Sequence, residues 1–305
     1  MVMMNNKNKI ILIGPPESGK TTISEVFFRN QNPLKLINNP LDPTRGINSN
    51  LYTLFNSQLG IHDLAGQENA HWFSSGRNVF SNTDLVVCIF DITNSVEIFF
   101  QFLMKVVNGM LKMEELSETQ IFILLHKIDL VNSAYLSKKK KIIKEFFKSL
   151  HQKEREIRIF GTSIKKEHFY HTYQIMLGIL KTFFKQQQIS IEQSEFENLK
   201  TEMKLILNQK ILDNLNIKDI SSILKMKEEE LKFHLERLER LNFVDYKLQN
   251  DTVQFTHRSN YFKKGLQNEI LSKGKIEQTR GFELIHTFLN LVEQSRGINS
   301  TRSIF

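Results

Sequence analysis

The residues best suited to chemistry lie in a GxxxxGK[ST] motif, GPPESGKT, which runs from Gly14 to Thr21. The motif follows the strand-like segment KIILIG and precedes the helical segment TTISEVFFRN. In that position a loop turns backbone N–H groups toward an anion at the start of a helix, where the helix dipole also favours negative charge. Gly19 allows close approach of the backbone, Lys20 can reach the β- and γ-phosphates, and the Thr21 hydroxyl can ligate Mg²⁺. The motif therefore predicts a site for nucleotide phosphates and Mg²⁺.

A second motif, HKID from His126, indicates the base. It follows QIFILL, an apolar run that predicts a buried strand, so Asp129 would face the ligand crevice of an open α/β sheet. A carboxylate can accept hydrogen bonds from both N1–H and the exocyclic amine of guanine, whereas adenine offers no matching pair of donors. The Lys127 stem would lie against the base, and Ser163 and Ile164 would close its other side. A helix N-cap is the alternative role for Asp129.

These residues need a sheet to position them, and the pattern of the first 185 residues predicts one. Strand-like runs alternate with helical stretches, which is typical of a doubly wound α/β fold. We expect strands near residues 9, 51, 58, 84, 120 and 156, and helices near residues 20, 68, 96, 136 and 168. Residues 1–185 are therefore predicted to form one P-loop domain of the α/β class.

This part of the chain resembles the Ras superfamily of small GTPases, and within it the Rag GTPases. The resemblance rests on the two motifs above, on DLAGQE from Asp63 and on TSI from Thr162. His126 stands where most small GTPases have asparagine and where Rag proteins have histidine, as in FILLHKIDLV here. The segments SSGRNVFSNTDLVVCIFDI and IFGTSI are also similar to Rag sequences.

The resemblance implies roles for residues between the two motifs. Asp63 would hold Mg²⁺ through water, and Gly66 would offer its backbone N–H to the γ-phosphate. Gln67 would orient the attacking water. Thr44, in NPLDPTRGI, would be the switch threonine that reaches Mg²⁺ and the γ-phosphate. Thr53 is the alternative, but the spacing of Thr44 leaves room for a hairpin formed by YTLF and QLGIHD.

The predicted site therefore contains three overlapping sets. The catalytic residues are Gln67 and Lys20, and the metal ligands are Thr21, Thr44 and Asp63. The residues predicted to contact the nucleotide are Gly14, Glu17, Ser18, Gly19, Lys20, Thr21, Thr22, Thr44, Gly66, His126, Lys127, Asp129, Ser163 and Ile164.

Hydrolysis at such a site is expected to be slow. Without a helper arginine, GTPases of this type turn over at roughly 10⁻⁴ to 10⁻² per second. We therefore expect a protein partner that supplies the arginine, together with exchange factors and effectors. Pro16 stands where many small GTPases have glycine; because proline has no N–H, the phosphate donors must come later in the loop.

Composition favours a cytoplasmic protein. The single cysteine, Cys88, lies in the apolar run DLVVCIFD and is predicted to be a core residue. The longest apolar run is too short to span a membrane, and MVMMNNKNK resembles neither a signal nor a transit peptide. Val2 is not a myristoylation site, and STRSIF has no CaaX cysteine.

Contact with an endomembrane or the cell membrane is therefore expected to be indirect. Rag proteins likewise lack their own lipid and reach membranes through a scaffold complex. The chain has a formal charge of +8, and a run of lysines from Lys138 to Lys141 contributes to it. We interpret this run as a solvated helix end rather than a contact with anionic lipid.

From residue 186 the pattern changes. The polar segment QQQISIEQSE continues or links a helix, and helices are expected at 195–214, 218–225 and 228–241. FVDYKLQNDTVQFTH then alternates apolar and polar residues around 249–251, which predicts a hairpin. A further helix is expected near 276–295. Three helices and a hairpin indicate a winged helix, whose third helix would bury Leu231, Leu235, Leu238 and Leu241.

Here the sequence departs from the Rag pattern, because the strands of a roadblock domain are not recognisable in residues 186–305. A winged helix binds either protein or DNA. Residues 186–305 carry 18 Lys and Arg against 17 Asp and Glu, and the third helix begins with three glutamates at 228–230. Because this part of the chain is nearly neutral, binding to DNA would release few counterions and gain little affinity from it, so protein partners are favoured over DNA.

The sequence thus predicts a Rag-like switch that binds GTP or GDP with Mg²⁺, hydrolyses GTP slowly and recruits protein partners through residues 186–305. Formation of a dimer with a related GTPase is a further partner interaction that the sequence allows. The alternatives are a GTP-controlled DNA-binding regulator and a scaffold that holds nucleotide without cycling.

Overall fold

The computed structural model divides the chain into two compact units. Among the described residues, the first unit covers 7–24 and 41–163, and the second covers 25–40 and 164–295. The structure describes residues 7–54, 57–73, 78–111, 119–149, 157–182, 191–247 and 252–295. These units differ from the predicted domains, 1–185 and 186–305, which stay a prediction.

The first unit is built on a six-stranded sheet with strand order β2-β3-β1-β4-β5-β6. Neighbouring strands are parallel except β2 and β3, which pair antiparallel. The strands are β1 (Lys7–Ile13), β2 (Ile47–Leu54), β3 (Ser57–Leu64), β4 (Leu85–Asp91), β5 (Gln120–His126) and β6 (Ile157–Thr162). All six lie where the sequence predicts them. The β4 and β5 strands are apolar almost throughout, and β1 is apolar from Ile10 to Ile13, as expected of strands buried on both faces.

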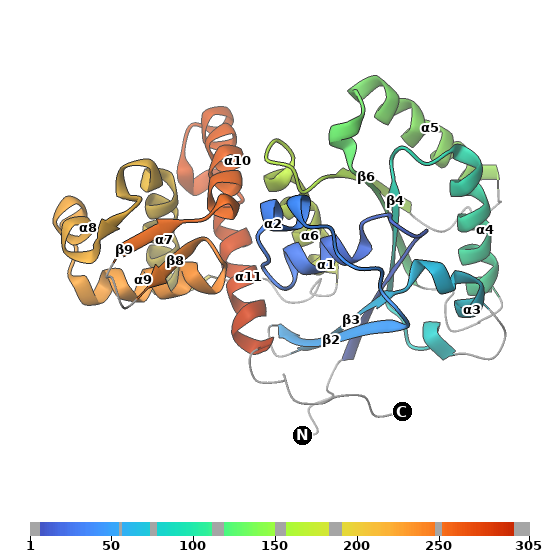
Figure 1. Ribbon diagram of the computed structural model, residues 1–305, viewed down its shortest axis with the longest axis horizontal. Helices are drawn as coiled ribbons and strands as arrows, with labels where there is room; N and C mark the ends of the chain where they lie inside the picture. The colour runs from blue at the N-terminus through green and yellow to red at the C-terminus, as the bar shows by residue number, and fades with distance from the viewer. Residues whose placement is uncertain are drawn as a thin grey trace. The chain divides into compact units, whose positions relative to one another are not determined.

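Helices α4 (Val96–Leu111) and α5 (Ser133–Ser149) lie along one face of this sheet (Figure 1). Their apolar side chains share one core with β4 and β5, and Cys88 is part of it. Cys88 is buried, as the sequence predicts, and burial raises the pKa of its thiol to about 12. Shorter helical segments are η1 (Gly66–Glu68), α3 (Asn69–Trp72), η2 (Asn78–Phe80) and η4 (Ile128–Leu130).

The expectation of a solvated helix end at Lys138–Lys141 is wrong for one lysine. The run lies inside α5, and Lys139 is buried. Its ammonium donates to the carbonyl oxygens of Ile92, at 2.6 Å, and Asn94, and lies 4.7 Å from the centroid of the Phe99 ring. A lysine can be buried where carbonyl oxygens and an aromatic face replace its water, and charge runs alone do not reveal such a position.

Helix α1 (Lys20–Phe27) begins in the first unit and ends in the second. The other helices of the second unit are α2 (Pro33–Asn38), α6 (Phe169–Lys181), α7 (Gln193–Leu212), α8 (Ile217–Leu224), α9 (Glu228–Arg240), α10 (His257–Lys273), η6 (Ile276–Gln278) and α11 (Gly281–Ser295). Strands β7 (Leu215–Asn216), β8 (Val244–Lys247) and β9 (Thr252–Phe255) form an antiparallel sheet of order β7-β9-β8.

Local sequence explains where these helices start and stop. Asn216 caps α8, since its side chain accepts a hydrogen bond from the Asp219 N–H at 2.9 Å. Thr256 caps α10 through the Ser259 N–H at 3.3 Å, and Gly274, with φ +82°, ends that helix.

The predicted order of three helices and a hairpin is present as α7, α8, α9, β8 and β9, with helix bounds within two residues of those expected. The four leucines of the predicted α9 stripe are buried. The hairpin turn at 249–251 and residues 186–190 of the polar segment lie outside the described residues. The sequence does not predict helices α2 and α10. The buried residues of α10 include Arg258 and Ser259 as well as Phe262, so its sequence has no continuous apolar stripe from which a helix could be predicted.

Helix α10 packs closely against α6 at a glycine. A Cβ atom on Gly265 would lie 2.0 Å from the Cβ of Tyr170. The Tyr170 hydroxyl also donates to the Glu269 carboxylate at 2.6 Å, which ties the same two helices together. Glycine in a helix interior normally costs about 1 kcal/mol relative to alanine, so its presence here reflects the close approach of the helices.

We therefore expect Gly265→Ala to lower the free energy of unfolding by about 1–3 kcal/mol, because overpacking outweighs the gain in helix propensity. Gly178→Ala on α6 is the matched control, since a Cβ atom added there would have no atom within 4 Å. That variant should be neutral or more stable by up to about 1 kcal/mol. Urea unfolding followed by circular dichroism measures both; equal midpoints for the two variants would contradict the packing argument.

Among the described residues no helix combines the length and the apolar character needed to cross a membrane.

Candidate functional site

The GPPESGKT loop connects β1 to α1, as the motif requires. Glu17 and Gly19 both adopt positive φ, +61° and +91°. Alternation into the left-handed region turns successive backbone N–H groups toward one side and forms an anion-binding concavity. Gly14 sits so close to β4 that a Cβ atom there would lie 2.0 Å from the Ile89 carbonyl oxygen. Ser18 is buried, and Thr22 lies in the first turn of α1.

The Lys20 ammonium is held inside this loop. It donates to the carbonyl oxygens of Gly14 and Pro15 at 3.1 and 2.8 Å, and to the Ser18 hydroxyl at 3.4 Å. Burial lowers the pKa of Lys20 to about 8, while the Asp63 carboxylate acts in the opposite direction. Phosphate oxygens beside the ammonium would favour its charged form further.

Three oxygen-bearing side chains meet next to this lysine. The Thr21 hydroxyl lies 2.7 Å from the Thr44 hydroxyl and donates to the Asp63 carboxylate at 2.6 Å. They come from the start of α1, the segment before β2, and β3. Hydroxyl and carboxylate oxygens are the ligands that Mg²⁺ prefers, so the donor set fits that ion. Thr53 instead lies within β2, opposite Gln58 of β3, which favours Thr44 as the switch threonine.

The segment after β3 lies against the phosphate loop. A Cβ atom on Gly66 would lie 2.6 Å from the Pro16 nitrogen and 2.8 Å from the Lys20 ammonium. The Asn69 side chain donates to the carbonyl oxygens of Gly14, at 3.1 Å, and Gly66, at 2.5 Å. Gln67, in η1, is exposed. The side chain of Gln67, which is predicted to orient the attacking water, is therefore exposed to solvent. The backbone of the preceding residue, Gly66, is held by the Asn69 side chain.

At the other end of the site Lys127 joins three segments. Its backbone is left-handed, with φ 63°, and its ammonium donates to the Glu17 carbonyl oxygen at 3.0 Å and to the Asp91 carboxylate at 2.7 Å. The contact with Glu17 fixes the phosphate loop relative to the HKID motif. The aliphatic stem of Lys127 therefore has a defined place at the carboxyl ends of β4 and β5.

Asp129 and Ser163 also meet. The Ser163 hydroxyl donates to the Asp129 carboxylate at 2.5 Å, and Asp129 is exposed at the carboxyl end of β5. An exposed carboxylate held by one hydroxyl retains lone pairs for two further donors. Ile164, the residue after Ser163, is buried.

His126 lies beneath the phosphate loop. It is buried at the end of β5, its Nδ1 atom lies 3.1 Å from the Thr162 hydroxyl, and a Cβ atom on Gly19 would lie 2.4 Å from its ring. Burial, reinforced by Lys127, lowers the pKa of His126 to about 4, so the ring is neutral at pH 7. This position supports the loop through packing.

Three residues that interact with the predicted site are missing from the sequence prediction. Asn69, Asp91 and Thr162 hold Gly66, Lys127 and His126 respectively. Asp91 carries a usable signal, since it is the polar residue that ends the apolar run DLVVCIFD. Thr162 has a signal as the first residue of the TSI motif, although it is not among the predicted site residues. Asn69 has no comparable signal, because nothing in its neighbours predicts a hydrogen bond to the loop.

A phosphate loop after the first strand, with a carboxylate and lysine after the fifth, defines a nucleotide-binding protein of the P-loop class. Residues 9–207 match the family described as the Gtr1/RagA G protein conserved region, so the chain belongs to the Gtr1/RagA family of G proteins. The Rag-like resemblance predicted from the sequence is thereby confirmed.

One relative is the GTP-binding protein GTR1 of Saccharomyces cerevisiae, which is 25% identical over 218 residues. The alignment covers 67% of this chain and 66% of the yeast protein, so just under two thirds of that relative is represented here.

Two solved structures are also similar. The small GTPase Arl6 (BBS3) of Trypanosoma brucei, with the bound nucleotide analogue GppNp, is 16% identical and covers 60% of this chain and 100% of its own, with a TM-score of 0.44. The bacterial selenocysteine-specific elongation factor EF-Sec is 13% identical and covers 61% of this chain and 30% of its own, with a TM-score of 0.41.

Proposed function

We propose that this protein is a guanine-nucleotide switch that binds GTP or GDP with Mg²⁺ and slowly hydrolyses GTP. The observation that carries the proposal is the meeting of the Thr21, Thr44 and Asp63 oxygens beside Lys20. Thr21 belongs to the phosphate loop, whereas Thr44 and Asp63 belong to the two segments that follow it. Nucleotide phosphates and their metal ion would thus be sensed by segments outside the loop, which is what a switch requires.

Guanine is the base that the Asp129 carboxylate suits. It stands exposed at the end of β5 with Ser163 as its partner, and the Lys127 stem is held beside it. Discrimination against adenine would come from the paired N1–H and amine donors of guanine. Membership of the Gtr1/RagA family supports the same assignment.

Mg²⁺ would be held by Thr21 and Thr44 directly and by Asp63 through water. When bound, the ion neutralises charge on the phosphate oxygens. Lys20 would add a positive charge to the same phosphates, and the N–H groups of the loop would bind their oxygens. The Gly66 N–H would reach the γ-phosphate, which couples the segment after β3 to the presence of GTP.

Hydrolysis would depend on Gln67, which would orient the attacking water. The residue stands beside Gly66 in η1, and Asn69 fixes the backbone at that point. None of the residues predicted from the sequence to form the site is an arginine, so a partner's arginine would be needed for fast turnover.

Gln67→Leu tests this role. We expect single-turnover GTP hydrolysis with Mg²⁺ to slow by about tenfold or more, because the attacking water loses its orientation. The affinity for GTP should stay unchanged, since the exposed Gln67 side chain takes no part in holding Lys20 or Thr21.

The matched control is Gln58→Leu, which makes the same change in β3. It should hydrolyse GTP at the wild-type rate. Equal rates for wild type and Gln67→Leu would remove Gln67 from the mechanism and favour a scaffold that holds nucleotide without cycling.

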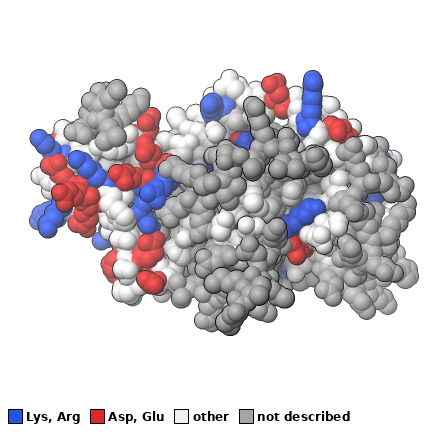
Figure 2. Space-filling view, turned by 90° about the horizontal axis from the view of Figure 1, so that it is seen from below, with Lys and Arg blue, Asp and Glu red and all other residues white. Residues whose placement is uncertain are grey.

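For the second unit we propose recruitment of protein partners through the winged-helix-like part. The N-terminal turn of α9, which a DNA reader would insert into the major groove, carries exposed Glu228, Glu229 and Glu230. On the face drawn in Figure 2, acidic and basic side chains of this part are interspersed. Both observations favour protein over DNA. Regulators, effectors and a related GTPase are the proposed partners, in the cytoplasm or at a membrane-bound scaffold.

A further inference from the structure

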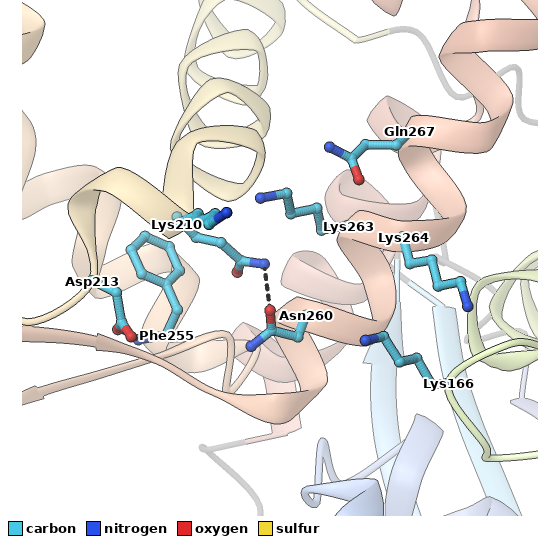
Figure 3. Close-up of a pocket in the computed structure, with 9 residues that line it drawn as sticks. Lys166, Lys210, Asp213, Phe255, Asn260, Lys263, Lys264 and Gln267 are labelled. Atoms are coloured by element: carbon cyan, nitrogen blue, oxygen red, sulfur yellow. Dashed lines mark hydrogen bonds between the residues drawn. The ribbon is translucent and has the colours of Figure 1, made fainter.

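The second unit contains a pocket that the proposed nucleotide site does not use. It has a volume of about 390 Å³ and lies between the end of α7, the first turns of α10 and the turn before α6. Four of the residues that line it are lysines: Lys166, Lys210, Lys263 and Lys264. Figure 3 shows Lys210 and Lys263 extending toward each other, with Lys166 entering from the opposite side.

The lysine charges repel one another. Burial lowers the pKa of Lys263, and the nearby Lys210 ammonium lowers it further. The helix dipole explains one cation, because Lys210 lies in the last turn of α7. It explains neither Lys263, in the middle of α10, nor Lys166, which precedes α6. A bound anion would remove the repulsion.

The carboxylates nearby are already engaged. Asp213 accepts hydrogen bonds from the Phe255 N–H at 2.8 Å and from the Asn214 side chain at 3.3 Å. Glu167 pairs with Lys264 at 3.2 Å. Within the described part of the chain, no carboxylate forms a salt bridge with Lys166, Lys210 or Lys263. Three cations of the pocket therefore remain available for a ligand.

Buried hydrogen bonds fix the frame on which these lysines stand. Gln209 is buried; its amide donates to Asn260 at 2.9 Å and accepts from the Ser259 hydroxyl at 2.7 Å. This joins α7 to α10 directly beside Lys210 and Lys263 (Figure 3). The positions from which the two lysines extend are consequently set by packed helices, so a ligand needs to order only their side chains.

We propose that this pocket binds a small anion carrying at least two phosphate groups. Lys210 and Lys263 would hold one phosphate and Lys166 another, since they face the pocket from opposite sides. Lysine is a compact point charge that suits phosphate from several directions. The same chemistry occurs in a soluble inositol polyphosphate and in the headgroup of a phosphoinositide lipid.

The test uses the full chain loaded with GDP and Mg²⁺, so that phosphate does not enter the nucleotide site. Inositol 1,4,5-trisphosphate is titrated by calorimetry, and vesicles of phosphatidylcholine with and without phosphatidylinositol 4,5-bisphosphate are tested by cosedimentation. We expect saturable binding that the double variant Lys210→Gln with Lys263→Gln weakens by about tenfold to a hundredfold. Lys166→Gln should weaken it by a smaller factor.

The control, Lys204→Gln with Lys218→Gln, removes two exposed lysines of the same unit and should bind as wild type does. Unfolding midpoints of all variants verify folding. Binding of the soluble trisphosphate alone assigns a soluble ligand, and added binding to phosphoinositide vesicles assigns the lipid headgroup; both support the pocket. Absence of saturable binding, equal affinity of the double variant, or equal affinity for inorganic phosphate overturns the proposal.

A Lys20→Ala variant separates this pocket from the nucleotide site. It should lose nucleotide and still bind the trisphosphate like wild type. If wild type itself fails to bind GDP, the proposed switch function is wrong, while the trisphosphate titration still decides the pocket.

Discussion

Replacing Asp129 with asparagine should lower the affinity for GTP by about 10²- to 10⁴-fold, because two charge-assisted hydrogen bonds to guanine are lost, each contributing about 1.5–3 kcal/mol. The same variant should gain affinity for xanthosine triphosphate. Xanthine presents a carbonyl where guanine has its amine, and an asparagine amide can donate to that oxygen. Competition binding with labelled GDP measures both changes.

The environment of Asp129 favours a selective effect on the base. The residue is exposed, and its partner is the Ser163 hydroxyl, which can donate to an amide oxygen as well as to a carboxylate. Lys127, which fixes the phosphate loop, pairs instead with Asp91 and the Glu17 carbonyl oxygen. The substitution should therefore leave the phosphate end of the site and the stability of the fold intact.

Asp245→Asn is the matched control, since it makes the same change at an exposed carboxylate on β8. It should bind GTP like wild type. If Asp129→Asn kept wild-type affinity for GTP, the base would be recognised elsewhere. If it lost GTP without gaining xanthosine triphosphate, the loss would reflect disruption of the site rather than exchange of base specificity.

The sheet of the first unit is predictable because its central strands are buried. β4 and β5 read as continuous apolar runs, and their polar ends, Asp91 and His126, mark the edge where ligands bind in open α/β sheets. The phosphate loop and HKID motifs lie at that edge. Long-range pairs such as Asn69 with Gly14 have no local pattern, so sequence alone does not reveal them.

Helix α10 shows most clearly which features of the fold cannot be predicted from the sequence. Prediction of helices relies on an apolar stripe, but α10 buries an arginine and a serine and packs a glycine against α6. An arginine in a sequence is normally read as a surface residue. In this protein Arg258 is instead buried, where it joins the end of α1, the loop that follows it and α6. These segments are distant from Arg258 in sequence and meet it only in the fold.

Replacing that arginine, Arg258, with methionine should lower the free energy of unfolding by about 2–4 kcal/mol. Its guanidinium donates to the carbonyl oxygens of Val26 and Gln31 at 2.6 and 3.1 Å, to the Asn30 side chain at 2.7 Å, and to the Tyr173 hydroxyl. Methionine fills a similar volume but leaves these buried acceptors unsatisfied.

Two effects oppose each other at this site. Burial lowers the pKa of Arg258, and no carboxylate of the described residues pairs with it, so removing the charge relieves a desolvation cost. Against this, each orphaned acceptor costs about 1–3 kcal/mol. The guanidinium also lies 5.1, 5.5 and 5.9 Å from the ring centroids of Tyr173, Phe169 and Phe243, and the variant loses all three cation–π contacts. Because four acceptors and three aromatic rings lose their partner, we expect the variant to be less stable than wild type.

Arg258→Lys separates charge from geometry. A lysine keeps the positive charge but cannot reach the end of α1, the following loop and α6 with one planar fork, so its unfolding free energy should fall between those of wild type and Arg258→Met. Arg29→Met is the matched control: its guanidinium is exposed and pairs with Glu25 at 2.9 Å, so the change should stay within about 0.5 kcal/mol. Urea unfolding of wild type and the three variants measures their unfolding free energies and so tests this expected order. A methionine variant at least as stable as wild type would mean that desolvation of the buried charge outweighs the hydrogen bonds it makes.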